Sequence, residues 1–83
     1  MSQRGTRPLS VTLYGKPDCH LCDDARVVLE RLRPELGFGL QEVDITSDDE
    51  LHRRYLERIP VVTLDGDELF DFFVDEEALR LKL

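Results

Sequence analysis

Cys19 and Cys22 are the only cysteines in this 83-residue chain, and two residues separate them. They follow a β-type run, Leu9 to Leu13, and precede a helical pattern of apolar residues. The free N–H groups and the dipole at a helix start favour negative charge, so they stabilise a thiolate on the first cysteine. The second cysteine faces the same side and can attack a mixed disulfide formed by the first. This spacing predicts a dithiol–disulfide redox site.

The apolar pattern predicts the elements that position the two cysteines. Residues 9–14 alternate between apolar and polar side chains, as in a strand. The helix that follows is expected to end at Pro34 and to bury one face. That face consists of residues at helical spacing, namely Leu21, Ala25, Val28, Leu29 and Leu32. A second strand is expected at 38–45, with Val43 and Ile45 on one face.

A second helix is expected to follow this strand. Ser47 and Glu50 have the spacing of a capping box, in which each side chain bonds the other residue's backbone N–H. The helix should run to about Glu57, and its apolar face consists of Leu51, Tyr55 and Leu56. Pro60 interrupts the chain there, and the apolar residues 61–64 predict a third strand.

The last part of the chain predicts a hairpin and a short helix. Asp65-Gly66 is a strong signal for a two-residue turn, and 68–72 should form the fourth strand. Asp75 can cap a final helix whose inner face consists of Ala78, Leu79 and Leu81. Strands joined through a helix run parallel, whereas hairpin strands run antiparallel. We therefore expect an α/β fold with a mixed four-stranded sheet and helices on both faces.

Length and composition indicate one folded, soluble domain at 9–83 behind a flexible lead-in at 1–8, and we expect a monomer. The formal net charge is −7, and residues 59–83 hold seven acidic side chains against two basic ones. Nucleic acid is not expected as a partner, because phosphate binding needs positive charge.

No apolar run approaches the roughly 20 residues of a membrane helix, and residues 1–8 lack the apolar core of a secretory signal. We therefore expect a cytoplasmic protein with no membrane partner.

Two segments together resemble a known family. Val11 to Cys22, VTLYGKPDCHLC, is similar to the active-site strand and loop of glutaredoxins and of the small redoxins that reduce ribonucleotide reductase. Arg58 to Val62, RIPVV, resembles their cis-proline segment. The resemblance covers about 9–72 and is nearest to a branch of short glutaredoxin-like proteins of the thioredoxin-fold superfamily. It implies a thioredoxin-like, glutaredoxin-type three-layer fold with the order βαβαββα.

The leading hypothesis is a thiol–disulfide oxidoreductase with no bound cofactor. Cys19 is the nucleophile and Cys22 the resolving thiol, and a protonated His20 would stabilise the thiolate. The substrate would be a disulfide-containing protein or small molecule, and glutathione or a reductase would restore the dithiol.

One alternative is a metal or iron–sulfur module built on the same cysteines. Since a closed zinc site needs four ligands, we expect no metal site within one chain. The other alternative is a thioredoxin-like protein-interaction domain.

Four further residues are candidates for substrate binding. Lys16 can meet a carboxylate of the partner, and Arg58 can bind a carboxylate or support the thiolate. The resemblance implies that the bond before Pro60 is cis and that this proline packs against the disulfide. It also implies that Ile59 pairs its backbone with an extended substrate.

The chain differs from familiar glutaredoxins in three places. His20-Leu21 stands where they carry Pro-Tyr between the cysteines, and Arg58-Ile59 stands where they commonly carry Thr-Val before the proline. Residues 72–76 contain no glycine, whereas the family has a Gly-Gly-x-Asp-type turn that helps hold the γ-glutamyl end of glutathione. Glycine permits a close backbone approach, and here the region is acidic through Asp75, Glu76 and Glu77. We therefore expect glutathione to be a poor reductant.

Overall fold

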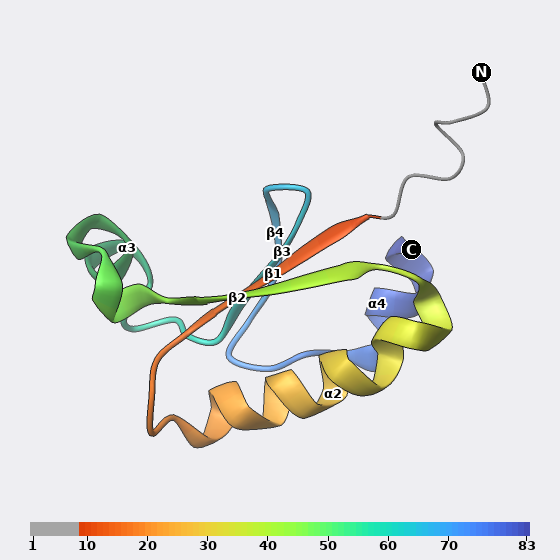
Figure 1. The fold of residues 1–83 in the computed structure, drawn as a ribbon, viewed down its shortest axis with the longest axis horizontal. Helices are drawn as coiled ribbons and strands as arrows, with labels where there is room; N and C mark the ends of the chain where they lie inside the picture. Colours follow the sequence, from red (N-terminus) through yellow and green to blue (C-terminus); the bar gives the residue numbers. More distant parts are fainter. Residues whose placement is uncertain (1–8) are drawn as a thin grey trace.

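A four-stranded mixed sheet organises the part of the chain that the computed structural model describes, residues 9–83 (Figure 1). Strand β1 (Ser10–Gly15) is parallel to β2 (Gly39–Asp44) and antiparallel to β3 (Val61–Leu64). Strand β4 (Asp67–Asp71) pairs antiparallel with β3, which gives the order β2-β1-β3-β4. The mixed sheet confirms the predicted fold class, and β3 has the predicted limits. The expected lead-in at 1–8 lies outside the described residues.

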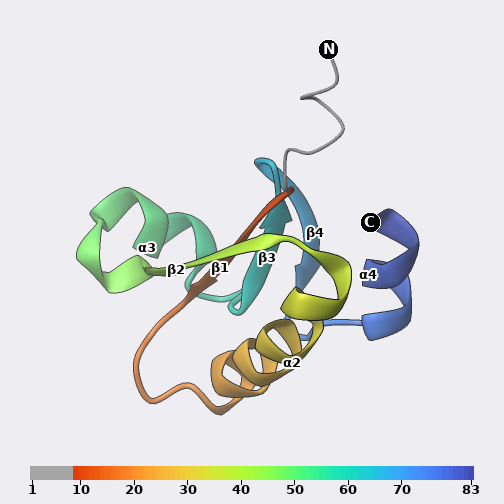
Figure 2. The same cartoon turned by 45° about the vertical axis from the view of Figure 1, so that its right-hand side comes forward.

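Both faces of this sheet are covered by helices, as Figure 2 shows. The α-helices are α2 (His20–Leu36), α3 (Asp49–Tyr55) and α4 (Glu76–Lys82). Leu13 of β1 packs with Leu29 of α2 and Leu79 of α4, whereas the next residue, Tyr14, packs with Tyr55 of α3. Successive strand residues point to opposite faces, so these two packing contacts lie on opposite sides of the sheet. The prediction of helices on both faces is confirmed.

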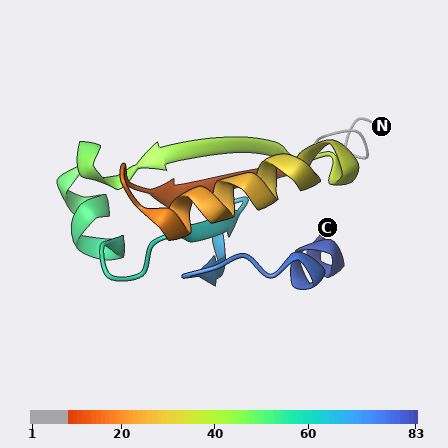
Figure 3. The same cartoon turned by 90° about the horizontal axis from the view of Figure 1, so that it is seen from below.

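Helix α4 lies beside the second half of α2 (Figure 3). Two ion pairs join these helices, Arg31 with Glu76 and Arg80 with Glu35. Both pairs are partly exposed, so each contributes little stability by itself. No helix among residues 9–83 has the length and apolar character needed to span a membrane.

Helix α2 continues through Pro34 and ends at Leu36, so the prediction that Pro34 stops it is wrong. A proline there removes only one backbone donor, and the extra turn packs Leu36 against the core. Gly37 ends the helix in the left-handed conformation, with φ 77°. Its N–H donates to the carbonyl of Arg33 at 2.8 Å, as in a common helix C-cap.

Leu21 and Leu81, which were expected on the inner faces of their helices, lie at the surface. Leu21 is 49% exposed and Leu81 is 85% exposed. The buried residues of α2 are instead Cys22, Ala25, Leu29 and Leu32. Leu21 is one residue, or about 100° around the helix, from Cys22, and Leu81 is about 200° from the buried Leu79. The face that meets the sheet therefore excludes both leucines.

A short 3-10 helix, η1 (Ile45–Ser47), separates β2 from α3. It makes Asp48 the N-cap of α3, and the Asp48 carboxylate accepts the N–H groups of Glu50 at 2.9 Å and Leu51 at 3.2 Å. The Ser47 hydroxyl donates to the carbonyl of Asp44 instead, so the predicted capping box is wrong. Helix α3 ends at Tyr55, two residues before the expected end, and Leu56 is exposed.

The hairpin from β3 to β4 forms where the Asp-Gly pair predicted it. Asp65 and Gly66 have φ values of 51° and 94°, as the favoured two-residue turn requires. Strand β4 begins and ends one residue earlier than expected, at Asp67 and Asp71. The cap of α4 is confirmed, because the Asp75 carboxylate accepts the N–H of Ala78 at 3.1 Å.

Candidate redox site

Cys19 is the N-cap of α2, at the point where the chain turns from the loop after β1 into the helix. Its sulfur accepts the N–H of Cys22 at 3.2 Å, and its carbonyl accepts the N–H of Asp23 at 3.0 Å. The first N–H groups of a helix have no partner within the helix and can bind a negative charge. Cys19 is half-buried, and its sulfur lies where the helix N-terminus can stabilise a thiolate.

Cys22 is enclosed, with 1% of its surface exposed. This burial raises the pKa of the Cys22 thiol from 9.0 to about 11, and the hydrogen bond with Cys19 acts in the same direction. The backbone N–H of Lys16 opposes the rise. The two cysteines therefore differ in exposure, since Cys19 is half-buried whereas Cys22 is enclosed by the protein.

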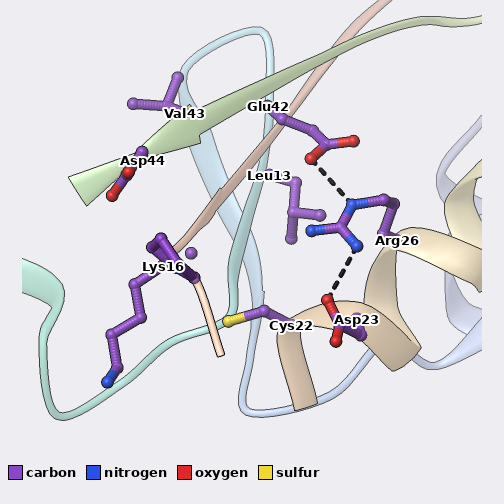
Figure 4. Close-up of a pocket in the computed structure, with 10 residues that line it drawn as sticks. Leu13, Lys16, Cys22, Asp23, Arg26, Glu42, Val43 and Asp44 are labelled. Carbon is purple, nitrogen blue, oxygen red and sulfur yellow. Dashed lines mark hydrogen bonds and ion pairs between the residues drawn. The ribbon is translucent and has the colours of Figure 1, made fainter. Parts of the chain in front are cut away.

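A pocket of about 260 Å³ adjoins Cys22 between β1, the start of α2 and the end of β2 (Figure 4). Arg26 spans one wall, and its guanidinium bonds Glu42 of β2 and Asp23 of α2, each at 2.8 Å. The hydrogen bond with Glu42 makes the largest contribution to raising the pKa of Arg26, and the bond with Asp23 acts in the same direction. This network was not predicted from the sequence, because its members come from two elements that only the fold brings together.

The cis-proline segment lies next to the cysteines. The Ile59–Pro60 bond is cis, as predicted, and both residues are buried. Ile59 belongs to the same apolar cluster as Cys22, and Cys19 packs against that cluster. The structure therefore brings the two motifs together from distant parts of the sequence. The contact of Pro60 with the disulfide, and the pairing of Ile59 with a substrate, stay predictions.

Arg58 is held by β4. Its guanidinium bonds Glu68 and Asp71, the latter at 3.3 Å, and it lies 5.8 Å from the ring centre of Tyr55. The hydrogen bond with Glu68, followed by that with Asp71, raises the pKa of Arg58. A substrate carboxylate would compete with these two side chains for Arg58, whose role in substrate binding stays a prediction.

The turn after β4 also contacts the cis-proline segment. The N–H of Phe72 bonds the carbonyls of Arg58 at 3.2 Å and Pro60 at 2.9 Å. Phe72 has φ 71°, a left-handed conformation that is rare for a bulky residue, and its side chain is 49% exposed. Phe73 beside it is exposed as well. The backbone of Phe72 thus contacts the cis-proline segment in the stretch without glycine.

Comparisons with known proteins identify the family. Residues 10–83 match the model of the glutaredoxin-like domain (DUF836). The chain belongs to this glutaredoxin-like family. The uncharacterized protein Rv0508 of Mycobacterium tuberculosis is 35% identical over 80 residues, which cover 90% of this chain and 81% of that protein. The confirmed family and the Cys19–Cys22 pair support a redox-type function.

Solved structures confirm the thioredoxin-like fold of this glutaredoxin-like chain. Protein Ne2328 from Nitrosomonas europaea is similar with a TM-score of 0.81 and 29% identity, and the match covers 93% of each chain. A thioredoxin from Halobacterium salinarum is 20% identical with a TM-score of 0.67, over 95% of this chain and 74% of that one. The second likeness shows the fold alone.

The remaining candidates lie at the rim of the redox site. Lys16 follows β1 and lines the pocket, and His20 is the first residue of α2; both are exposed. Their roles stay predictions. Within residues 9–83, no group of three or more His, Cys, Asp or Glu side chains is arranged to hold a metal ion.

Proposed function

We propose that this glutaredoxin-like protein is a thiol–disulfide oxidoreductase that reduces disulfides with the Cys19–Cys22 dithiol. The observation that carries the proposal is the placement of the Cys19 sulfur at the N-terminus of α2, 3.2 Å from the N–H of Cys22. An accessible sulfur at a helix start beside an enclosed second thiol is the arrangement that dithiol exchange needs.

The reaction has two displacement steps. The Cys19 thiolate attacks one sulfur of the substrate disulfide, forms a mixed disulfide and releases the first substrate thiolate. Cys22 then loses its proton and attacks the Cys19 sulfur, which forms the Cys19–Cys22 disulfide and releases the second substrate thiolate. Two electrons pass to the substrate, and the two protons of the dithiol end on the substrate thiols.

A protein partner is the favoured source of electrons. Phe72 occupies the stretch where familiar glutaredoxins have their glycine turn, and Asp75, Glu76 and Glu77 follow it. Glutathione carries net negative charge, so this region weakens its binding through sterics and through charge that solvent partly screens. We propose that glutathione reduces the protein poorly and that a reductase or another protein does so better. This activity suits a monomer in the cytoplasm, where catalytic disulfides are transient.

Two measurements test the proposal. Mild oxidation should remove two hydrogens from the intact mass, and dithiothreitol should restore them; thiols that stay free under oxidant would refute the redox function. Turnover of a model disulfide should then be compared with glutathione plus glutathione reductase and with thioredoxin reductase. Activity with glutathione equal to that of an ordinary dithiol glutaredoxin would refute the proposed preference.

A further inference from the structure

Gly15, the last residue of β1, lies against the thiol of Cys22. It is buried and pairs with Asp44 of β2. Its φ is outside the positive range that Gly37 and Gly66 adopt, so its backbone conformation does not require glycine. A Cβ at this position would lie 2.8 Å from Cys22 Sγ and 3.1 Å from Cys22 Cβ. Glycine therefore fits this position because there is no room for a side chain beside Cys22, and not because the backbone conformation demands it.

The atom that can yield to such a Cβ is the sulfur itself. Gly15 is fixed in the ladder with β2, and Cys22 is fixed in the first turn of the 17-residue helix α2. The Cys22 side chain has a single heavy-atom torsion, χ1, that moves its sulfur between staggered positions. Rotation about χ1 can therefore move the Cys22 thiol away from a side chain at Gly15, whereas the 3.1 Å contact with Cys22 Cβ needs a shift of a few tenths of an ångström between the two elements.

We infer that Gly15 is a positioning residue for the resolving cysteine, because it leaves open the space that the reduced Cys22 thiol occupies. The inference rests on the proposed function. In the dithiol, Cys22 Sγ lies against Gly15, whereas in the disulfide it must lie about 2.05 Å from Cys19 Sγ. A Cβ at Gly15 opposes the first arrangement, and in the proposed disulfide the sulfur moves toward Cys19 and away from this Cβ. Losing this space therefore favours the disulfide, and the dithiol becomes a stronger two-electron reductant.

The redox equilibrium of Gly15→Ala tests this inference. The variant and the wild type are equilibrated in mixtures of reduced and oxidised glutathione, quenched with acid, alkylated and weighed by mass spectrometry. We expect the equilibrium to shift toward the Cys19–Cys22 disulfide by about tenfold, which corresponds to about 30 mV. An unchanged equilibrium in a folded Gly15→Ala protein would overturn the inference.

Gly39→Ala is the matched control, since Gly39 is also a strand glycine without positive φ. The nearest atom to a Cβ there is the Leu9 carbonyl oxygen at 3.9 Å, an ordinary contact. Its redox equilibrium should equal that of the wild type. A shift equal to that of Gly15→Ala would show a general effect of strand glycines and would also overturn the inference.

A stability comparison keeps the inference testable if Gly15→Ala folds poorly or if the wild type forms no disulfide. Gly15→Ala is introduced into the wild type and into Cys22→Ala, which lacks the sulfur, and the thermal midpoints are compared. We expect a smaller loss of thermal midpoint in the Cys22→Ala background, and an equal loss in both backgrounds would overturn the proposed contact.

The proposed function and the role of Gly15 fail in different ways. A wild type that forms no disulfide refutes the proposed function. A wild type that cycles normally, beside a Gly15→Ala variant with an unshifted equilibrium, refutes only the role of Gly15.

Discussion

The cysteine segment, residues 15–22, and the turn after β4, residues 72–75, both contact the cis-proline segment, yet they differ in how closely they follow the glutaredoxin pattern. The cysteine segment has an N-cap thiol and a buried second thiol, as dithiol exchange needs. The turn after β4 instead places Phe72 in a left-handed conformation in a stretch that has no glycine. We therefore propose that the chemistry and the choice of partner depend on separate segments. Each can therefore be altered while the other is kept.

The largest effect is expected from removing the nucleophile. Cys19→Ser should abolish disulfide reduction, because an alcohol does not replace the thiolate in exchange. Cys22→Ser should keep the first attack and accumulate a mixed disulfide between Cys19 and the substrate. Mass spectrometry of the trapped adduct distinguishes the two variants. Faster alkylation of Cys22 than of Cys19 in the wild type would reverse the assigned roles.

A strong pH dependence is expected for the buried thiol. Burial raises the pKa of Cys22 to about 11, so its thiolate fraction should grow about tenfold per pH unit below that value. In Cys19→Ser, where burial persists, the iodoacetamide rate of Cys22 should rise in this way from pH 7 to 10. A plateau near pH 8.5 would show that Cys22 is not enclosed.

The same pKa predicts how stability changes with pH. The folded value of about 11 exceeds the ordinary 9.0, so between these values the folded protein keeps a proton that the unfolded chain has lost. The contribution of Cys22 is fully present below pH 9 and is lost as pH rises toward 11. The free energy of unfolding measured in urea should therefore fall more between pH 8 and 10 in the reduced wild type than in reduced Cys22→Ser.

Replacing Phe72 tests the other segment. The left-handed conformation destabilises the fold by roughly 1–2 kcal/mol when the residue has a Cβ. Phe72→Gly should therefore raise the free energy of unfolding in urea titrations by about 1 kcal/mol. It should also increase turnover with glutathione several-fold. Phe73→Gly is the control, because Phe73 is an exposed aromatic residue without positive φ. Equal changes in both variants would argue against a special role for the Phe72 backbone.

The smallest effect is expected from Arg58→Ala. The pairs of Arg58 with Glu68 and Asp71 are partly exposed, so the loss of stability should be small. If Arg58 binds a glutathione carboxylate, the remaining turnover with glutathione should fall while turnover with a protein reductant is unchanged. Arg54→Ala is the matched control, since Arg54 pairs with Glu50 and lies 5.8 Å from the same Tyr55 ring. An equal loss in both variants would exclude a specific carboxylate site.

Features that depend on neighbours along the chain could be predicted from the sequence alone. The Cys19–Cys22 pair at a helix start, the turn at Asp65-Gly66 and the cap at Asp75 all follow from local backbone preferences and short-range hydrogen bonds. The order of strands and helices follows from the period of the apolar residues. The family resemblance rested on the short segments 11–22 and 58–62, and the comparison with the family confirms it.

Only the tertiary structure decided which side of each element meets the sheet and which distant residues meet one another. Leu21 is exposed because α2 presents Cys22 to the core, and α2 passes Pro34 because the next turn can bury Leu36. The ion pairs of Arg58 with β4, and the contact of Gly15 with Cys22, join residues from separate elements. Packing between elements depends on the whole fold, so local sequence patterns do not contain it.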